Sequence, residues 1–289
     1  MGNYVIFTDS GADVSDAVLE KWGVKCCPLT FAFDSGERSF AGSEMPVKQF
    51  YDKMRSGGIA RTSALNAETA KSCFRPELER GNDVFYLAFP SGLSSTYSTA
   101  KLAAEELSEE FPDRKIIVSD SLCASAGQGL LLWLAVKKRN GGTDILELEK
   151  YCEQTRLHIC HWFTVDDLVY LKRGGRISAA TALAGTVLGI KPVLHVDDEG
   201  HLINMSKVRG RKASIRAIAD KLSELKLPDG DKTVFISHGD CADDAAALAE
   251  IIKSSEPDAD IKLITDIGPV IGAHSGPGTL AVFFVGKNR

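Results

Sequence analysis

The stretch VFYLAFPSGLSSTYSTAKLAAEELSEEF, residues 84–111, contains the unit from which this fold is built. Its first six residues are apolar, as in a buried strand, and a long helix begins at Ser94 or Ser95. A strand, a hydroxyl-rich turn and a helix in this order predict parallel strands with right-handed crossovers. Ligands of such sheets bind beyond the carboxyl ends of the strands, so the turn PSGLSS is a candidate binding loop.

The same alternation covers the first half of the chain. Further strands are predicted at YVIFTDS, at VKCCPLTFAF (24–33) and at KIIVSDS, with helices between them. Beyond the helix DILELEKYCEQTRL the pattern changes, and the turn DDEGH between two apolar runs indicates a hairpin. We therefore predict an α/β fold with a parallel-sheet, Rossmann-like N-terminal domain (1–155). An α+β domain with a mixed sheet (156–289) follows.

Composition and charge limit the classes of function. The 289 residues are 44% hydrophobic and 25% charged, which is typical of a globular protein. A net charge of −5 argues against a nonspecific nucleic-acid-binding protein. The apolar stretches are too short to span a bilayer, so we expect no stable membrane insertion. With no signal-peptide pattern and seven irregularly spaced cysteines, we expect reduced thiols and a cytoplasmic location.

Three short loops rich in glycine and hydroxyl groups are the candidate functional segments: RTSALN (61–66), PSGLSSTY (90–97) and GAHSGPG (272–278). Ser94 could direct its hydroxyl at an anion or simply cap a helix. Thr62 and Ser63 could also bind an anion, although their local sequence favours a cap on the next helix. His274, in what we expect to be a flexible polar loop, could be an anion donor, a general base or a surface residue.

Other polar clusters carry weaker signals. His158, Cys160 and His161 are residue types that bind metals, but on a strand His161 would point away from the other two. No second cluster completes a tetrahedral set, so we predict no metal site. The basic turns KRGGRIS (172–178) and KVRGRK (207–212) could recognise phosphate or a partner, but we interpret them as solvated turns.

Taken in order along the chain, these segments resemble the motifs of a known family. The chain resembles the DegV family of bacterial fatty-acid-binding proteins, the FakB-type acyl-carrying subunits of fatty acid kinase. The matching segments are TDSGAD, RTSALN, PSGLSSTYSTA, FTVDDLVYLKRGGRIS, IKPVLHVDDEGHL, KVRGRKA and IGPVIGAHSGPG. The chain departs from the family at Ala64-Leu65, where many members have Gln-Pro. It also has Pro90 and Ser95 where Ser or Thr, and Gly, are common.

The resemblance implies that one long-chain fatty acid is buried between two domains, with no other cofactor. The residues that match the carboxylate-binding positions are Thr62, Ser94 and His274. We add as supporting residues Ser63, Gly92 and Arg209, with Arg211 as the alternative to Arg209. The apolar segment AATALAGTVLG (179–189), predicted to be helical, is rich in small residues and could leave room for an acyl chain.

The resemblance also implies a protein that is not itself an enzyme. A separate ATP-dependent kinase subunit would phosphorylate the bound carboxylate to an acyl phosphate, and the sequence has no GxxxxGK[ST] nucleotide motif. The alternative is a Ser/His esterase or acyl-transfer enzyme that uses Ser94 and His274, with Asp9 or Asp266 orienting the imidazole. A third possibility is a sugar-binding subunit of dihydroxyacetone type with a covalent histidine.

Overall fold

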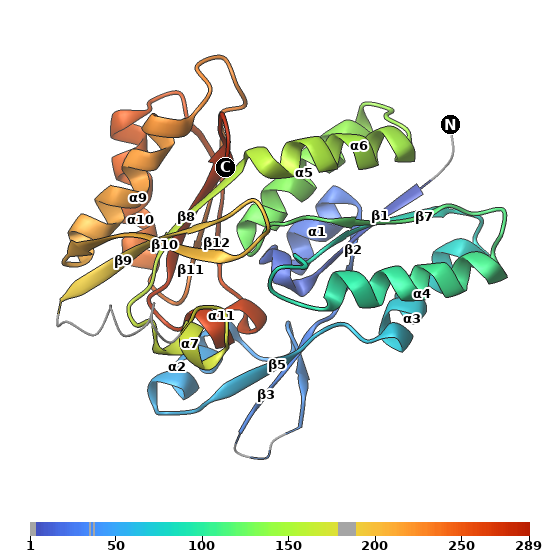
Figure 1. The fold of residues 1–289 in the computed structure, drawn as a ribbon, viewed down its shortest axis with the longest axis horizontal. Helices are drawn as coiled ribbons and strands as arrows, with labels where there is room; N and C mark the ends of the chain where they lie inside the picture. The colour runs from blue at the N-terminus through green and yellow to red at the C-terminus, as the bar shows by residue number, and fades with distance from the viewer. Residues whose placement is uncertain (1–3, 35, 37, 179–188) are drawn as a thin grey trace.

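The computed structural model describes residues 4–34, 36, 38–178 and 189–289. The helix predicted over 179–189 therefore falls almost entirely outside the described residues. Within them the strands form three sheets, a four-stranded, a six-stranded and a three-stranded one. Figure 1 shows the two larger sheets side by side, with the three-stranded sheet below them.

The four-stranded sheet is entirely parallel, in the order β2-β1-β6-β7, which confirms the predicted N-terminal parallel sheet. Alternate side chains of β1 and β6 point to opposite faces, and both faces are buried. Helices α3 and α4 cover one face, and α5 covers the other. The elements of this part are β1 Tyr4–Asp9, η1 Ser10–Ala12, α1 Asp16–Trp22, β2 Val24–Cys27, α3 Ala67–Glu79, β6 Asp83–Ala88, α4 Thr96–Glu110, β7 Ile116–Asp120, α5 Ala126–Asn140 and α6 Ile145–Thr155.

The six-stranded sheet is mixed, in the order β10-β9-β8-β13-β11-β12, as predicted for the C-terminal half. Strands β11 and β12 are parallel, whereas the predicted hairpin β9–β10 is antiparallel. Helices α9 and α10 cover one face, and α5 packs on the other, so α5 lies between the two large sheets (Figure 1). The elements are η2 Arg156–His158, β8 Ile159–Thr164, α7 Val169–Arg173, β9 Ile190–Val196, β10 Leu202–Arg209, α9 Arg211–Leu225, β11 Thr233–His238, α10 Ala242–Ser255, β12 Asp260–Asp266, α11 Pro269–Ser275 and β13 Leu280–Val285.

The three-stranded sheet corrects the prediction of one long strand at VKCCPLTFAF. The segment forms two strands in different sheets, β2 and β3 (Thr30–Phe33). Pro28 separates them because it has no N–H to donate to a sheet. Strand β3 pairs with β4 (Phe40–Ala41) and with β5 (Ala60–Ser63), and helix α2 (Val47–Arg55) lies between β4 and β5 in the chain.

Strand β5 also corrects the expectations for the RTSALN segment. Thr62 and Ser63 lie in this strand rather than in a loop, and Thr62 pairs with Phe31 of β3. The helix α3 is capped instead by Asn66, whose Oδ1 accepts a hydrogen bond of 2.8 Å from the N–H of Thr69. The prediction that Thr62 or Ser63 caps this helix is therefore wrong, and their hydroxyl groups are not used there.

Two further local predictions are wrong. The segment around His274 is not a flexible loop but the helix α11, which begins with Pro269 and ends at Gly276 with φ of 81°. Proline suits the first helical position, and glycine suits the left-handed φ after the last. His158 lies in the 3₁₀ helix η2 rather than on the strand that carries Cys160.

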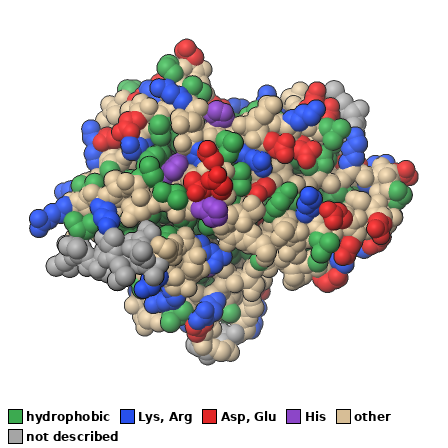
Figure 2. Space-filling model, viewed as in Figure 1, with side chains coloured by type: hydrophobic (Ala, Val, Ile, Leu, Met, Phe, Trp, Pro, Cys, Tyr) green, Lys and Arg blue, Asp and Glu red, His purple; other side chains and the backbone are tan. Residues whose placement is uncertain are grey.

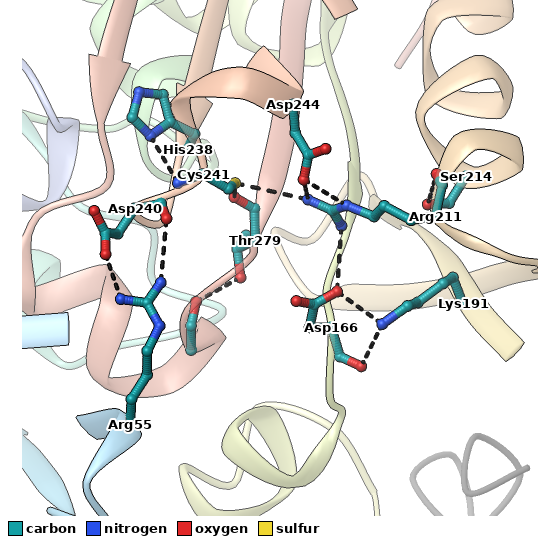
Figure 3. A network of polar contacts seen from close by, with 11 residues as sticks. Arg55, Asp166, Lys191, Arg211, Ser214, His238, Asp240, Cys241, Asp244 and Thr279 are labelled. Atoms are coloured by element: carbon teal, nitrogen blue, oxygen red, sulfur yellow. Dashed lines mark hydrogen bonds and ion pairs between the residues drawn. The ribbon is translucent and has the colours of Figure 1, made fainter. Parts of the chain in front are cut away.

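The two halves of the chain are in direct contact. Tyr51 of α2 donates a hydrogen bond of 2.9 Å from its hydroxyl to the carbonyl of Ile267, just before α11. Arg55 of the same helix forms an ion pair with Asp240, which follows β11 (Figure 3). The predicted domain boundary near residue 155 stays a prediction, because the three-stranded sheet packs against C-terminal residues.

Candidate functional site

A cavity lies where the carboxyl end of the parallel sheet meets the inner face of the mixed sheet. It encloses about 1010 Å³, including space open to solvent. Most of its described lining is apolar and comes from both halves of the chain: Leu29, Phe89, Leu93, Phe163, Leu171, Val196, Leu202, Ile267, Val270, Ile271, Ala281 and Phe283.

Three of the predicted site residues line this cavity, and two of them are in contact. Strand β5 and helix α11 bring Thr62 and His274 together, with 2.7 Å between Thr62 Oγ1 and His274 Nε2. Ser94 lines the same cavity just before α4, and its Oγ lies 2.9 Å from Thr96 Oγ1 and accepts from the Thr96 N–H. Ser63 is also in the lining and is exposed at the rim.

Burial lowers the pKa of His274, the nearby positive charge of Arg176 lowers it in the same direction, and together they bring it to about 4. The imidazole is therefore neutral at pH 7 and carries one N–H. A proton on Nε2 would be donated to Thr62 Oγ1, which would leave the Thr62 hydroxyl proton for an anion. A carboxylate beside the ring would raise the pKa of His274 again, because opposite charges favour the protonated form.

Arg176 is a site residue that the sequence interpretation missed. It lines the cavity and donates from Nη2 to the carbonyl of Leu93 (2.8 Å) and from Nη1 to that of Gly174 (2.5 Å). Burial lowers its pKa from the ordinary arginine value, although an arginine stays charged at neutral pH. The turn KRGGRIS, which contains it, was interpreted as a solvated turn. Its place in a segment resembling a family motif was the one signal that could have identified it.

The remaining supporting residues lie elsewhere. Gly92 is not among the described lining residues; a Cβ there would come within 2.5 Å of the carbonyl oxygen of Glu199, so Gly92 allows the loop to contact the β9–β10 turn. Arg209 is exposed at the end of β10 and is also outside that lining. Figure 3 shows that Arg211 turns toward Asp244 and Asp166, with which it forms ion pairs of 2.8 and 3.7 Å.

A serine esterase arrangement is not assembled around His274. The imidazole contacts Thr62 rather than Ser94. Asp9 accepts hydrogen bonds from the Tyr86 hydroxyl (2.8 Å) and the Phe89 N–H (2.7 Å). Asp266 lies 3.5 Å from His238. Neither carboxylate named as a candidate therefore orients the His274 ring.

The metal-like sequence cluster is used for structure. Both ring nitrogens of His161 have partners: Nδ1 lies 2.8 Å from the Ile159 carbonyl, and Nε2 accepts from the Ala124 N–H (3.3 Å). Over residues 4–34, 36, 38–178 and 189–289, no three His, Cys, Asp or Glu side chains are grouped so that they could hold a metal ion.

The surface charges and the helix lengths bear on the expected classes of function. On the face shown in Figure 2, acidic and basic side chains are interspersed. In the part of the chain that the structure describes, no helix combines the length and the apolar character that crossing a bilayer requires.

This geometry defines an α/β protein with an apolar cavity between two sheets and a polar end made of hydroxyls, an imidazole and a guanidinium. The chain belongs to the DegV family: the model described as "Uncharacterised protein, DegV family" matches residues 3–287. A DegV domain-containing protein of Clostridium perfringens is 41% identical over an alignment of 290 positions, which covers 100% of this chain and 99% of that protein.

Solved structures in the family share the whole fold. A stearic-acid-binding protein from Eubacterium ventriosum has a TM-score of 0.87 at 27% identity and covers 98% of each chain. A Thermotoga maritima protein described as revealing a fatty acid binding function has a TM-score of 0.85 at 29% identity, over 99% of this chain and 100% of that one.

Proposed function

We propose that this chain binds a long-chain fatty acid and holds the carboxylate through Thr62, Ser94 and His274. It then presents the carboxylate to a separate kinase subunit, which phosphorylates it to an acyl phosphate. The chain itself performs no catalysis in this proposal. The observation that carries it is one cavity whose described lining is mostly apolar and includes the hydrogen-bonded Thr62–His274 pair. The fatty-acid binding of its solved relatives supports it.

The apolar wall accounts for the affinity. Burial of each methylene contributes about 0.8 kcal/mol, so a sixteen-carbon chain contributes on the order of 10 kcal/mol before ordering costs. Phe89, Phe163 and Phe283, contributed by both halves of the chain, give the acyl chain a dry environment. A buried carboxylate without partners would cancel this gain, so the polar end is required for binding.

The polar end accounts for the orientation of the ligand. Thr62 and Ser94 supply hydroxyl donors, and Arg176 supplies positive charge close to the imidazole of His274. Ser63 and Ser95, beside them, are exposed. The carboxylate would therefore lie close to the exposed rim of the cavity while its chain is buried deeper, and this supports access by a partner kinase.

Native mass spectrometry of the protein as expressed in bacteria tests lipid binding. The expected result is a co-purified fatty acid, and titration of the delipidated protein with hexadecanoate should restore the complex. If no lipid co-purifies and hexadecanoate does not bind on titration, the proposal is contradicted.

The kinase step needs its own assay. The loaded protein, a bacterial fatty acid kinase catalytic subunit and ATP should yield acyl phosphate, which hydroxylamine traps as a hydroxamate. A His274→Ala variant should reduce the yield. A fluorophosphonate probe that labels Ser94 would instead favour the esterase alternative, for which no contact described above provides support. The cytoplasmic location expected from the sequence stays a prediction.

A further inference from the structure

Besides Thr62, Ser63, Ser94 and Ser95, three hydroxyl side chains of the described residues line the cavity: Ser125, Ser275 and Thr279. Two of them have their hydrogen bonds in place. Ser125 Oγ lies 2.5 Å from Asp13 Oδ2 and 2.9 Å from Ser237 Oγ. Thr279 Oγ1 lies 2.9 Å from the carbonyl oxygens of Ser275 and Gly276.

Ser275 differs from both. Only 5% of the Ser275 surface is exposed, and its Oγ is buried without a hydrogen-bond partner among the described residues. A buried hydroxyl without a partner is destabilising, so native proteins rarely keep one unless something else binds it. Because Ser275 lines a ligand cavity, the missing partner is to be sought on the ligand.

The position of Ser275 specifies which part of the ligand it meets. It follows His274 in helix α11, and both residues line the cavity. The contact of Thr279 with the Ser275 backbone places Ser275 on the β13 side of the carboxylate-binding end. An acyl chain whose carboxylate is at His274 would therefore bring its second or third carbon near Ser275.

Proton counting specifies the chemical group. The proton of Thr279 Oγ1 is donated to a backbone carbonyl, so this oxygen keeps only its acceptor lone pairs. Ser275 Oγ has both a proton and lone pairs available. A ligand hydroxyl can accept from Ser275 and donate to Thr279, whereas a keto oxygen can only accept.

We propose that Ser275 and Thr279 form a second polar subsite, which recognises a hydroxyl on the second or third carbon of the bound fatty acid. The ligand class is then a 2- or 3-hydroxy long-chain fatty acid. This inference rests on the proposed fatty-acid binding. It specifies further that the cavity prefers a fatty acid with a hydroxyl substituent near its carboxylate.

Titration calorimetry on the delipidated full chain tests it with four probes: hexadecanoate, 2-hydroxyhexadecanoate, 3-hydroxyhexadecanoate and 12-hydroxyoctadecanoate. The wild-type protein should bind the better of the 2- and 3-hydroxy acids about fivefold to tenfold more tightly than hexadecanoate, the value of one satisfied hydrogen bond. Ser275→Ala should abolish this preference and leave hexadecanoate binding unchanged. Ser95→Ala, at the rim of the same cavity, should keep the preference.

The outcomes separate the two proposals. If hexadecanoate does not bind at all, the proposed function fails. If hexadecanoate binds but the wild-type protein shows no preference for a 2- or 3-hydroxyl, the subsite is refuted, whatever the variant does. It is also refuted if the 12-hydroxy acid is preferred equally, or if Ser275→Ala keeps the preference, because a trapped water would then be the partner of Ser275.

Discussion

The Thr62→Val substitution tests the carboxylate site most directly. Valine keeps the shape of threonine and suits a strand, so β5 should persist while the hydroxyl 2.7 Å from His274 Nε2 is lost. A hydrogen bond to a charged group contributes about 1.5–3 kcal/mol. Because Thr62 is only partly buried, we use the lower half of that range, which predicts about 10- to 40-fold weaker binding of hexadecanoate.

The comparison with an uncharged ligand makes this prediction specific. Hexadecanol has the same chain without the carboxylate, and a bond to a neutral group contributes about 0.5–1.5 kcal/mol, so its affinity should fall less. Displacement of a fluorescent fatty acid from delipidated protein gives both dissociation constants. Thr30→Val on the neighbouring strand β3, outside the described cavity lining, is the matched control. Equal losses for both ligands, or no loss for hexadecanoate, would refute the assignment of Thr62.

Three other predictions concern charge and close contacts. Burial raises the pKa of Asp13 to about 8, so the free energy of unfolding of the wild type should fall relative to that of Asp13→Asn as pH rises from about 4 to 8. If chemical denaturation shows a constant difference in unfolding free energy between the two proteins over this pH range, the prediction is wrong. Arg176→Met should move the NMR titration of His274 in the ligand-free protein upward from about 4, and an unchanged midpoint would exclude the charge effect of Arg176. Gly92→Ala should lower the melting temperature, since its Cβ would come within 2.5 Å of the Glu199 carbonyl; an unchanged melting temperature in calorimetry would count against this contact.

The sequence predicted the parts of the fold whose periodicity is strong. The run at 84–88 and the helix after it are local patterns, and the structure forms β6 and α4 there. The hairpin at DDEGH was predictable for the same reason, because its turn chemistry lies within five residues.

The failures share a physical cause, which is tertiary pairing that local patterns do not contain. Strand β5 is polar in Arg61–Ser63 and is held by its pairing with β3. Helix α11 has glycine and proline at both ends, which suggested a loop, yet its buried side chains pack against α7 and the three-stranded sheet. The importance of Arg176 was likewise hidden, because only folding brings the turn that contains it to Leu93.

The contact between α2 and α11 has a consequence for how this protein unfolds. Phe50 and Tyr51 are fully covered, and Ala273 from the C-terminal half belongs to the same apolar cluster. A fragment ending at residue 155 would leave these aromatic rings facing water and would be prone to aggregation. The N-terminal and C-terminal halves of the chain are therefore expected to unfold in a single cooperative transition. A longer linker inserted between the two halves would not make either half stable by itself.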